Sequence, residues 1–197
     1  MSDKTRIVIA EDEAIIRMDL REMLEEEGFD VVAEAADGHK AVEAVRDHSP
    51  DLAILDIKMP GMDGIRAAEV ITRERLAAVL ILTAFSQRDL AAQAAQAGAM
   101  AYLVKPFQKA DLLPAIEVAL GRFGEMNKLQ DEVHDLEERL EGRKVVEKAK
   151  GLLMEQGLTE AEAYRIMQRA AMDRHKRLVE VAQLILEGAL NGEIETS

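Results

Sequence analysis

Short, continuous apolar runs alternate with helical patterns along the first 120 or so residues of the chain. The runs occupy residues 7–10, 31–35, 52–55, 79–82 and 101–104. Strands that are buried on both faces of a parallel sheet have this unbroken apolar composition. Helical patterns lie between the runs, at residues 14–27, 39–47, 64–74 and 88–97, and a fifth begins near Lys109. The alternation predicts an open, doubly wound sheet of five parallel strands with helices on both faces.

The chain after Lys109 predicts helices only. Five apolar residues in it follow one another at spacings of three and four, which is the a/d pattern of a coiled coil. They are Met126, Leu129, Val133, Leu136 and Leu140. This stripe either packs on its own domain or forms the seam of a dimer, and the polar residues around it favour the dimer. Gly121 and Gly124 precede the stripe, and we expect them to interrupt the helix as a hinge.

Three further helical patterns complete the chain, at residues 143–156, after Thr159, and at residues 178–190. Thr159 with Glu162 three residues later is the pattern of a helix N-cap with a capping box. Each pattern has a single apolar stripe, so no helix of this segment is stable alone. We therefore expect a coiled-coil linker followed by an all-α three-helix bundle.

Composition excludes several classes of protein. The 197 residues are 48% hydrophobic, which is enough for one good domain and a smaller one. The absence of cysteine excludes disulfides, thiolate zinc sites and cysteine nucleophiles. No apolar stretch approaches the roughly 20 residues that span a bilayer, and the first residues lack a signal-peptide layout. We expect a cytoplasmic protein with no membrane partner.

Charge is distributed unevenly along the chain. The net charge is −13, which by itself disfavours a nucleic-acid partner. Residues 142–177, however, hold nine basic and five acidic residues, a surplus of four positive charges. The sequence thus joins a locally basic module to a strongly acidic one.

Polar side chains stand where the predicted strands end. They are Glu11 and Asp12, Asp56, Thr83, and Lys105. Because the carboxyl ends of parallel strands meet at one edge of the sheet, we expect these side chains to surround one pocket. Three crowded carboxylates require a cation or shifted pKa values, and carboxylate oxygens are ligands that Mg²⁺ prefers. Asp56 can then attack a phosphoryl group, while Thr83 and Lys105 bind the phosphoryl oxygens.

The motifs Glu11-Asp12, Asp56, Thr83-Ala84 and Lys105-Pro106 resemble, in chain order, the receiver domain of two-component response regulators. The resemblance covers residues 6–120 and implies the flavodoxin-like fold of that family. It also implies that a sensor histidine kinase phosphorylates Asp56 and that Mg²⁺ is the cofactor. The implied metal ligands are Glu11, Asp12, Asp56 and the backbone carbonyl of Lys58. Thr83 and Tyr102 are implied as the switch pair, and Lys105–Pro106 as a cis peptide.

Residues 126–187 are similar to the ANTAR domain, the RNA-binding output domain of AmiR- and NasR-type antitermination regulators, with a coiled-coil helix at residues 126–141. The similarity rests on Ala149-Lys150-Gly151-Leu152-Leu153-Met154, Thr159, Ala163-Tyr164, Arg169, Ala171-Met172, Leu178 and Val181-Ala182. The resemblance implies a homodimer that binds hairpin RNA, so that a transcription terminator cannot form.

Eight basic residues of this segment are candidates for RNA contacts. They are Lys144, Lys148, Lys150, Arg165, Arg169, Arg174, Lys176 and Arg177. Lys144 and Lys148 are one helical turn apart, as are Arg165 and Arg169, so each pair shares a helix face. The alternative for each residue is a solvated position with local salt bridges, such as one between Arg169 and Asp173.

We expect a response regulator that is phosphorylated on Asp56 and controls gene expression by RNA binding and antitermination. We do not expect an enzyme, because a phosphoryl acceptor of this kind only phosphorylates or dephosphorylates itself slowly. One alternative is a DNA-binding response regulator, although the last helix carries almost no residues able to read bases. The other alternative is a phosphorelay protein whose helical tail binds another protein.

Overall fold

A computed structural model describes residues 4–84 and 88–188 of the chain. These residues form two compact units, the first ending at Asn127 and the second beginning at Lys128. Strands occur only in the first unit of this described part, and the second unit is helical.

Five parallel strands form the sheet of the first unit, in the order β2-β1-β3-β4-β5. They are β1 (Arg6–Ala10), β2 (Asp30–Ala35), β3 (Leu52–Asp56), β4 (Ala78–Thr83) and β5 (Ala101–Val104). Each strand begins and ends within one residue of its predicted range. The predicted five-stranded, doubly wound sheet with a flavodoxin-like fold is therefore confirmed.

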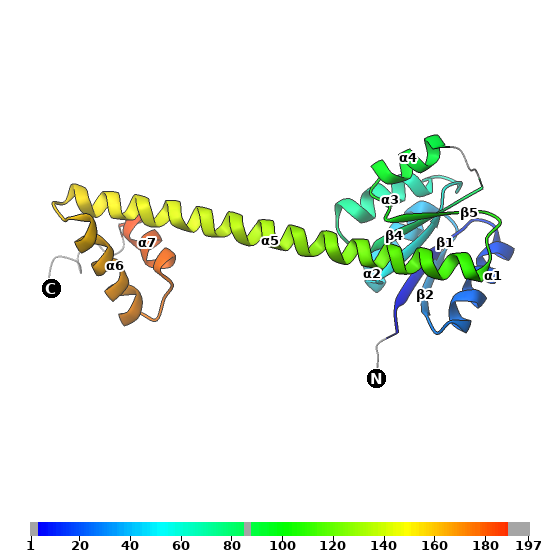
Figure 1. The fold of residues 1–197 in the computed structure, drawn as a ribbon, viewed down its shortest axis with the longest axis horizontal. Coiled ribbons are helices and arrows are strands. Elements are labelled where there is room, and N and C mark those ends of the chain that lie inside the picture. The colour runs from blue at the N-terminus through cyan, green and yellow to red at the C-terminus, as the bar shows by residue number, and fades with distance from the viewer. Residues whose placement is uncertain (1–3, 85–87, 189–197) are drawn as a thin grey trace. The chain divides into compact units, whose positions relative to one another are not determined.

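Helices cover both faces of this sheet (Figure 1). One face packs against α2 (Gly38–His48), α3 (Gly64–Arg73) and α4 (Arg88–Gln96). The other face packs against α1 (Ala14–Glu26) and the first turns of α5 (Lys109–Glu155). The first four helices lie within one residue of their predicted bounds.

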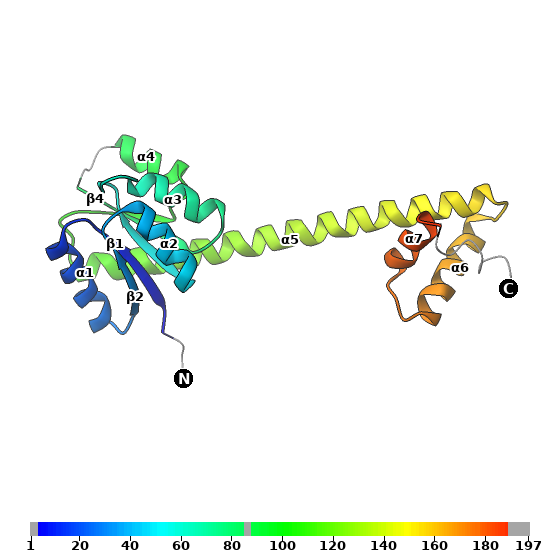
Figure 2. The ribbon, with the colours of Figure 1, turned by 180° about the vertical axis from the view of Figure 1, so that it is seen from behind.

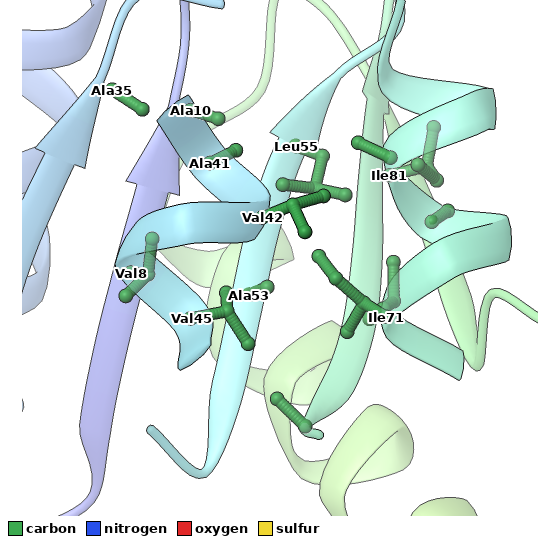
Figure 3. Close-up of a cluster of buried hydrophobic side chains, with 14 of the residues drawn as sticks. Val8, Ala10, Ala35, Ala41, Val42, Val45, Ala53, Leu55, Ile71 and Ile81 are labelled. Atoms are coloured by element: carbon green, nitrogen blue, oxygen red, sulfur yellow. The ribbon is translucent and has the colours of Figure 1, made fainter. Parts of the chain in front are cut away.

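Aliphatic side chains fill the space between the sheet and the α2–α3 layer. Figure 3 shows Val42 and Val45 of α2 pointing toward β3, where Ala53 and Leu55 are fully buried. Ile71 of α3 is also fully buried in this cluster. Burying one such Val, Leu or Ile side chain stabilises a fold by roughly 1.5–3 kcal/mol. These contacts hold the strands, and hence their carboxyl ends, in fixed register.

Local signals set the ends of these helices. The side chains of Asp37 and Asp63 are N-caps, accepting hydrogen bonds from the backbone N–H groups of Lys40 and Arg66 at 2.9 and 2.8 Å. Gly98 follows α4 at φ +83°, a left-handed conformation that residues with a Cβ rarely adopt.

Helix α5 corrects one prediction and decides part of another. Gly121 and Gly124 lie inside this helix, so the predicted interruption of the helix is wrong. A glycine costs a helix interior about 1 kcal/mol relative to alanine. Apolar contacts offset that cost, because Phe123 and Met126 pack against the core of the first unit. Met126, the first residue of the a/d stripe, thus packs on its own unit, which is one of the two arrangements that the pattern allows.

The second unit is a bundle of three helical segments: the last turns of α5, α6 (Glu160–Asp173) and α7 (Leu178–Leu186). Figures 1 and 2 show α6 and α7 beside the end of α5. The core of this bundle is aliphatic, with a buried methionine: Ala149, Leu153, Ala163, Met167, Val181, Ala182 and Ile185. The predicted bundle is present, but its first helix is the end of α5 and does not begin at residue 143.

The capping box before α6 is confirmed. The Thr159 hydroxyl accepts a hydrogen bond from the Glu162 N–H, and the Glu162 carboxylate accepts one from the Thr159 N–H at 2.9 Å. The last helix is shorter than predicted, because α7 ends at Leu186 and Gly188 has φ +75°. Residues 189 and 190, which the prediction included, lie outside the described residues. Across residues 4–84 and 88–188, no helix combines the length and apolar character that a membrane span requires.

Candidate functional site

The polar residues that follow β1, β3, β4 and β5 meet at one edge of the sheet, as the strand pattern predicts. A cavity of about 250 Å³ opens there. Its lining residues are Asp12, Glu13, Asp56, Ile57, Lys58, Thr83, Ala84 and Lys105. The strands bring together side chains that are far apart in the sequence.

Three carboxylates form the acidic part of this site. Glu11 is fully buried and Asp56 is buried, while Asp12 is exposed. One carboxylate oxygen from each of the three lies within 4.8 Å of the others. This set fits Mg²⁺, which binds oxygen ligands. Mg²⁺ usually takes one or two carboxylates directly and completes its coordination with waters, so the three carboxylates supply enough ligands.

The ammonium group of Lys105 lies between two of these carboxylates. Its Nζ is 2.7 Å from Asp56 Oδ1 and also forms an ion pair with Glu11 Oε2. Burial alone lowers the pKa of Lys105, but hydrogen bonds and charges from Asp56 and Glu11 outweigh it, so the net pKa is raised. Burial, helped by the charge of Asp56, raises the pKa of Glu11 despite the contact with Lys105. The Lys105 ammonium therefore neutralises part of the negative charge of the carboxylates.

Backbone groups orient the same carboxylates. The Lys58 N–H donates a hydrogen bond to Asp56 Oδ2 at 2.8 Å, and the Glu13 N–H donates one to Glu11 Oε1 at 3.3 Å. Each carboxylate is held on one oxygen by the backbone and on the other by Lys105. This leaves Asp56 in a defined orientation at the wall of the cavity.

Two residues that support the site were not found from the sequence. A Cβ on Gly64 would lie 2.0 Å from the backbone oxygen of Asp56, so only glycine fits there. The dipeptide Asp63-Gly64 is typical of a turn, but a tertiary contact of this kind has no local sequence signal. Arg17 of α1 donates a hydrogen bond to the Glu11 carbonyl and pairs with Glu34 at 3.2 Å. A lone arginine on an amphipathic helix gives no signal for this role.

The two residues of the implied switch pair lie in different surroundings. Thr83 is buried at the end of β4 and lines the cavity. Tyr102 lies on β5, does not line the cavity, and is 52% exposed. The peptide bond between Lys105 and Pro106 is cis, as the resemblance implied.

The candidate RNA-binding residues are spread over the second unit, and several are engaged in ion pairs. Lys150 is buried and pairs with Glu147 at 2.9 Å and Glu160 at 2.7 Å, which ties α5 to α6. Lys144 pairs with Glu141 at 2.6 Å, and Arg177 with Glu180 at 3.6 Å.

The other candidates differ in exposure. Lys148, Arg165, Arg169 and Lys176 are exposed, whereas Arg174 is half-buried. Within the described part of the chain, the alternative salt bridge between Arg169 and Asp173 is not formed.

Comparison with known proteins agrees with this architecture. Residues 7–117 match the response regulator receiver domain, and residues 134–186 match the ANTAR domain. The transcriptional regulatory protein PdtaR of Mycobacterium tuberculosis is 58% identical over 183 residues, which cover 92% of this chain and 89% of that protein. The chemotaxis protein CheY of Bacillus subtilis is 44% identical over 117 residues, which cover 59% of this chain and 98% of CheY.

Solved structures match the first unit. A two-component response regulator of the LuxR family from Aurantimonas sp. superimposes with a TM-score of 0.57 at 35% identity, covering 60% of this chain and 86% of that one. The CheX–CheY–BeF3–Mg²⁺ complex from Borrelia burgdorferi matches with a TM-score of 0.54 at 30% identity, covering 56% and 85%. The chain therefore belongs to the two-component response regulators, in the group that joins a receiver domain to an ANTAR domain.

Proposed function

We propose that a sensor histidine kinase phosphorylates this response regulator on Asp56, and that the phosphorylated form binds hairpin RNA and prevents transcription termination. The observation that carries the proposal is the position of Asp56. Asp56 is the last residue of β3, and its side chain lines the cavity. One of its carboxylate oxygens lies within 4.8 Å of a carboxylate oxygen of Glu11 and of Asp12, and Oδ1 lies 2.7 Å from Lys105 Nζ. Such a carboxylate has both the nucleophilic oxygen and the surrounding charges that phosphoryl transfer requires.

The transfer requires no general base on this chain. A carboxylate oxygen of Asp56 attacks the phosphorus of a phosphohistidine, so that a P–O bond forms and the P–N bond breaks. The leaving imidazole nitrogen keeps the electron pair and takes a proton from solvent. Hydrogen bonds from Lys105 and the Lys58 N–H hold the Asp56 carboxylate during the attack.

Glu11, Asp12, Asp56 and the backbone carbonyl of Lys58 would hold Mg²⁺ in this site. When bound, the cation supplies the positive charge that offsets the carboxylates and the phosphoryl oxygens. The Borrelia CheY complex, which contains BeF3 and Mg²⁺, supports this assignment by similarity. The protein acts as a phosphoryl acceptor and not as an enzyme, with only slow self-phosphorylation or dephosphorylation.

Thr83 and Tyr102 form the switch in this proposal. The Thr83 hydroxyl, at the cavity wall, hydrogen-bonds the new phosphoryl group, and the exposed ring of Tyr102 moves toward the space next to Thr83. Phosphorylation then shifts the population between two states of the β4–β5 side of the receiver. Lys105 contacts the phosphoryl oxygens in the second state.

The output in this proposal is a homodimer of the ANTAR domain. We place the receiver at residues 6–120 and the ANTAR domain at residues 126–187. The coiled coil, which the sequence pattern places at residues 126–141, has its seam from Leu129 onward, because Met126 packs on the first unit. Leu129, Val133, Leu136 and Leu140 support a dimer seam, because each is more than half exposed in the single chain. Two-fold pairing buries this stripe and presents two basic surfaces to RNA.

Phosphodonor labelling of wild-type protein and of Asp56→Ala tests the receiver part. Wild type should gain one phosphoryl group with Mg²⁺ present, and Asp56→Ala should gain none. Asp63→Ala, which removes a carboxylate N-cap outside the cavity, is the control and should be labelled normally. Undiminished labelling of Asp56→Ala would contradict the proposal.

Gel shifts with hairpin RNA and duplex DNA, at stated salt and with or without beryllofluoride, test the output. Binding of RNA over DNA is expected. Preference for duplex DNA would support the DNA-binding alternative, and absence of both would support a tail that binds a protein.

A further inference from the structure

One face of α6 carries aromatic, basic, amide and thioether side chains. Its members are Tyr164, Arg165, Gln168, Arg169 and Met172, which we call the α6 outer face. Their spacings of one, three and four residues place them within an arc of about 140° on a helix of 3.6 residues per turn. All five are exposed, including 40% of Tyr164 and 76% of Met172.

The α6 outer face contains no acidic residue, although the chain carries 38 of them. The acidic residues of α6 are Glu160, Glu162 and Asp173, and all three lie outside that arc. Glu160 pairs with Lys150. Glu162 accepts hydrogen bonds from Thr159 and also interacts electrostatically with Arg165 at the edge of the face. The outer face is therefore a positively charged strip on a protein whose net charge is −13.

Neither arginine of this face is held in an ion pair with a described carboxylate. Arg165 donates a hydrogen bond to the backbone oxygen of Ala161 at 3.3 Å, and its charge helps to lower the pKa of the neighbouring Glu162. Lys150 and Lys144, by contrast, are held by carboxylates at less than 3 Å. An exposed arginine without a carboxylate partner loses less on binding a phosphate, because no existing pair has to be broken.

We infer that the α6 outer face binds the unpaired loop bases of an RNA hairpin. The ring of Tyr164 stacks on a base, the guanidinium planes of Arg165 and Arg169 contact phosphates or stack on bases, and the amide of Gln168 pairs with a base edge. Met172 adds an apolar contact beside them. This inference rests on the proposed RNA binding and adds which surface performs it.

Two pairs of matched variants test the inference in the full-length protein with beryllofluoride. Arg165→Ala/Arg169→Ala removes two charges from the outer face, and Arg66→Ala/Arg73→Ala removes two from exposed positions on α3 of the receiver. The α6 variant should lose affinity for hairpin RNA by about tenfold or more, and its salt dependence should fall by roughly one unit of slope per arginine. The α3 variant should stay within about twofold of wild type.

Two variants of Tyr164 test base stacking separately from the charge of the arginines. Tyr164→Ala should lower affinity by about fivefold or more, since base–aromatic stacking is lost. Tyr164→Phe keeps the ring and should bind like wild type. Unchanged far-UV circular dichroism and melting temperature would confirm that each variant is folded, as expected for exposed positions.

The outcomes distinguish the inference from the proposed function. If wild type binds RNA and the α6 variants bind equally well, the outer face is not the binding surface and the inference fails alone. If the α6 variants keep RNA binding but no longer form the dimer in light scattering, the outer face contacts a second copy of the protein and the inference is overturned. If wild type binds no hairpin, the proposed function fails first.

Discussion

The Nζ of Lys105 lies 2.7 Å from Asp56 Oδ1 and also forms an ion pair with Glu11. One ammonium group thereby offsets two buried carboxylates that come from different strands. A divalent cation in the same site would compete with this group for the same oxygens. The stability of the receiver and its affinity for Mg²⁺ are therefore linked.

Replacing Lys105 by alanine should lower the free energy of unfolding by about 3 kcal/mol without Mg²⁺, because the buried carboxylates lose their partner. Added Mg²⁺ should restore more stability to Lys105→Ala than it adds to wild type. Urea unfolding with and without Mg²⁺ measures both effects. The control is Lys109→Ala, whose surface ion pairs with Glu26 and Glu27 are worth less than about 1 kcal/mol. Equal losses in the two variants would contradict this reading of the site.

Gly64→Ala and Gly121→Ala should change stability in opposite directions. A Cβ on Gly64 meets the Asp56 carbonyl oxygen at 2.0 Å, so we expect a loss of about 1–3 kcal/mol and reduced phosphodonor labelling. A Cβ on Gly121 meets nothing within 4 Å, so Gly121→Ala should gain about 0.5–1 kcal/mol from helix propensity. Thermal unfolding of both variants checks the pair. A destabilising Gly121→Ala would mean that α5 bends at this residue.

Leu136→Lys should weaken the proposed dimer by about tenfold or more, because a seam leucine buries apolar surface only in the pair. The melting temperature of the monomer should not change, since Leu136 is 57% exposed. Light scattering over a concentration series, with beryllofluoride, measures the effect. Asp131→Lys alters an exposed position outside the a/d pattern and should dimerise normally. A Leu136→Lys protein that dimerises like wild type would exclude this stripe as the seam.

Acid should weaken the second unit through its helix-capping carboxylates. Hydrogen bonds from the Thr159 hydroxyl and N–H hold the pKa of Glu162 below the ordinary value of a glutamate, and the Arg177 N–H does the same for the pKa of Glu180. A carboxyl whose folded pKa is depressed stabilises the fold above its unfolded pKa, and this contribution is lost as pH falls through the folded value. The melting temperature should therefore drop between about pH 5 and pH 3.

Glu162→Gln should reduce the size of that acid effect, because its side chain does not titrate. Glu155→Gln changes an exposed carboxylate at the end of α5 and should leave the acid transition as in wild type. Circular dichroism melts over the pH series compare the three proteins. An acid effect that is identical in all three would show that capping by Glu162 is not its cause.

The strands and the position of the pocket could be predicted because both follow from local patterns. Unbroken apolar runs such as 79–82 that alternate with helical patterns are typical of buried parallel strands, and Asp56 and Thr83 stand at the ends of two such runs. The continuity of α5 could not be predicted, since Gly121 and Gly124 read locally as breaks. Their neighbours Phe123 and Met126 are held by tertiary packing, which no local rule includes. The same limit applied to Lys150, whose carboxylate partners include Glu160 on another helix.

The side of α6 that packs in the bundle and the α6 outer face are made of different residues. Ala163 and Met167 assemble the bundle from one side of the helix, and the residues of the outer face lie on the other. Exchanges at Gln168 or Met172 therefore leave the interior packing intact. Substitutions on the outer face can therefore accumulate over evolution and change what this surface contacts. The packing of Ala163 and Met167 in the bundle stays the same when they do.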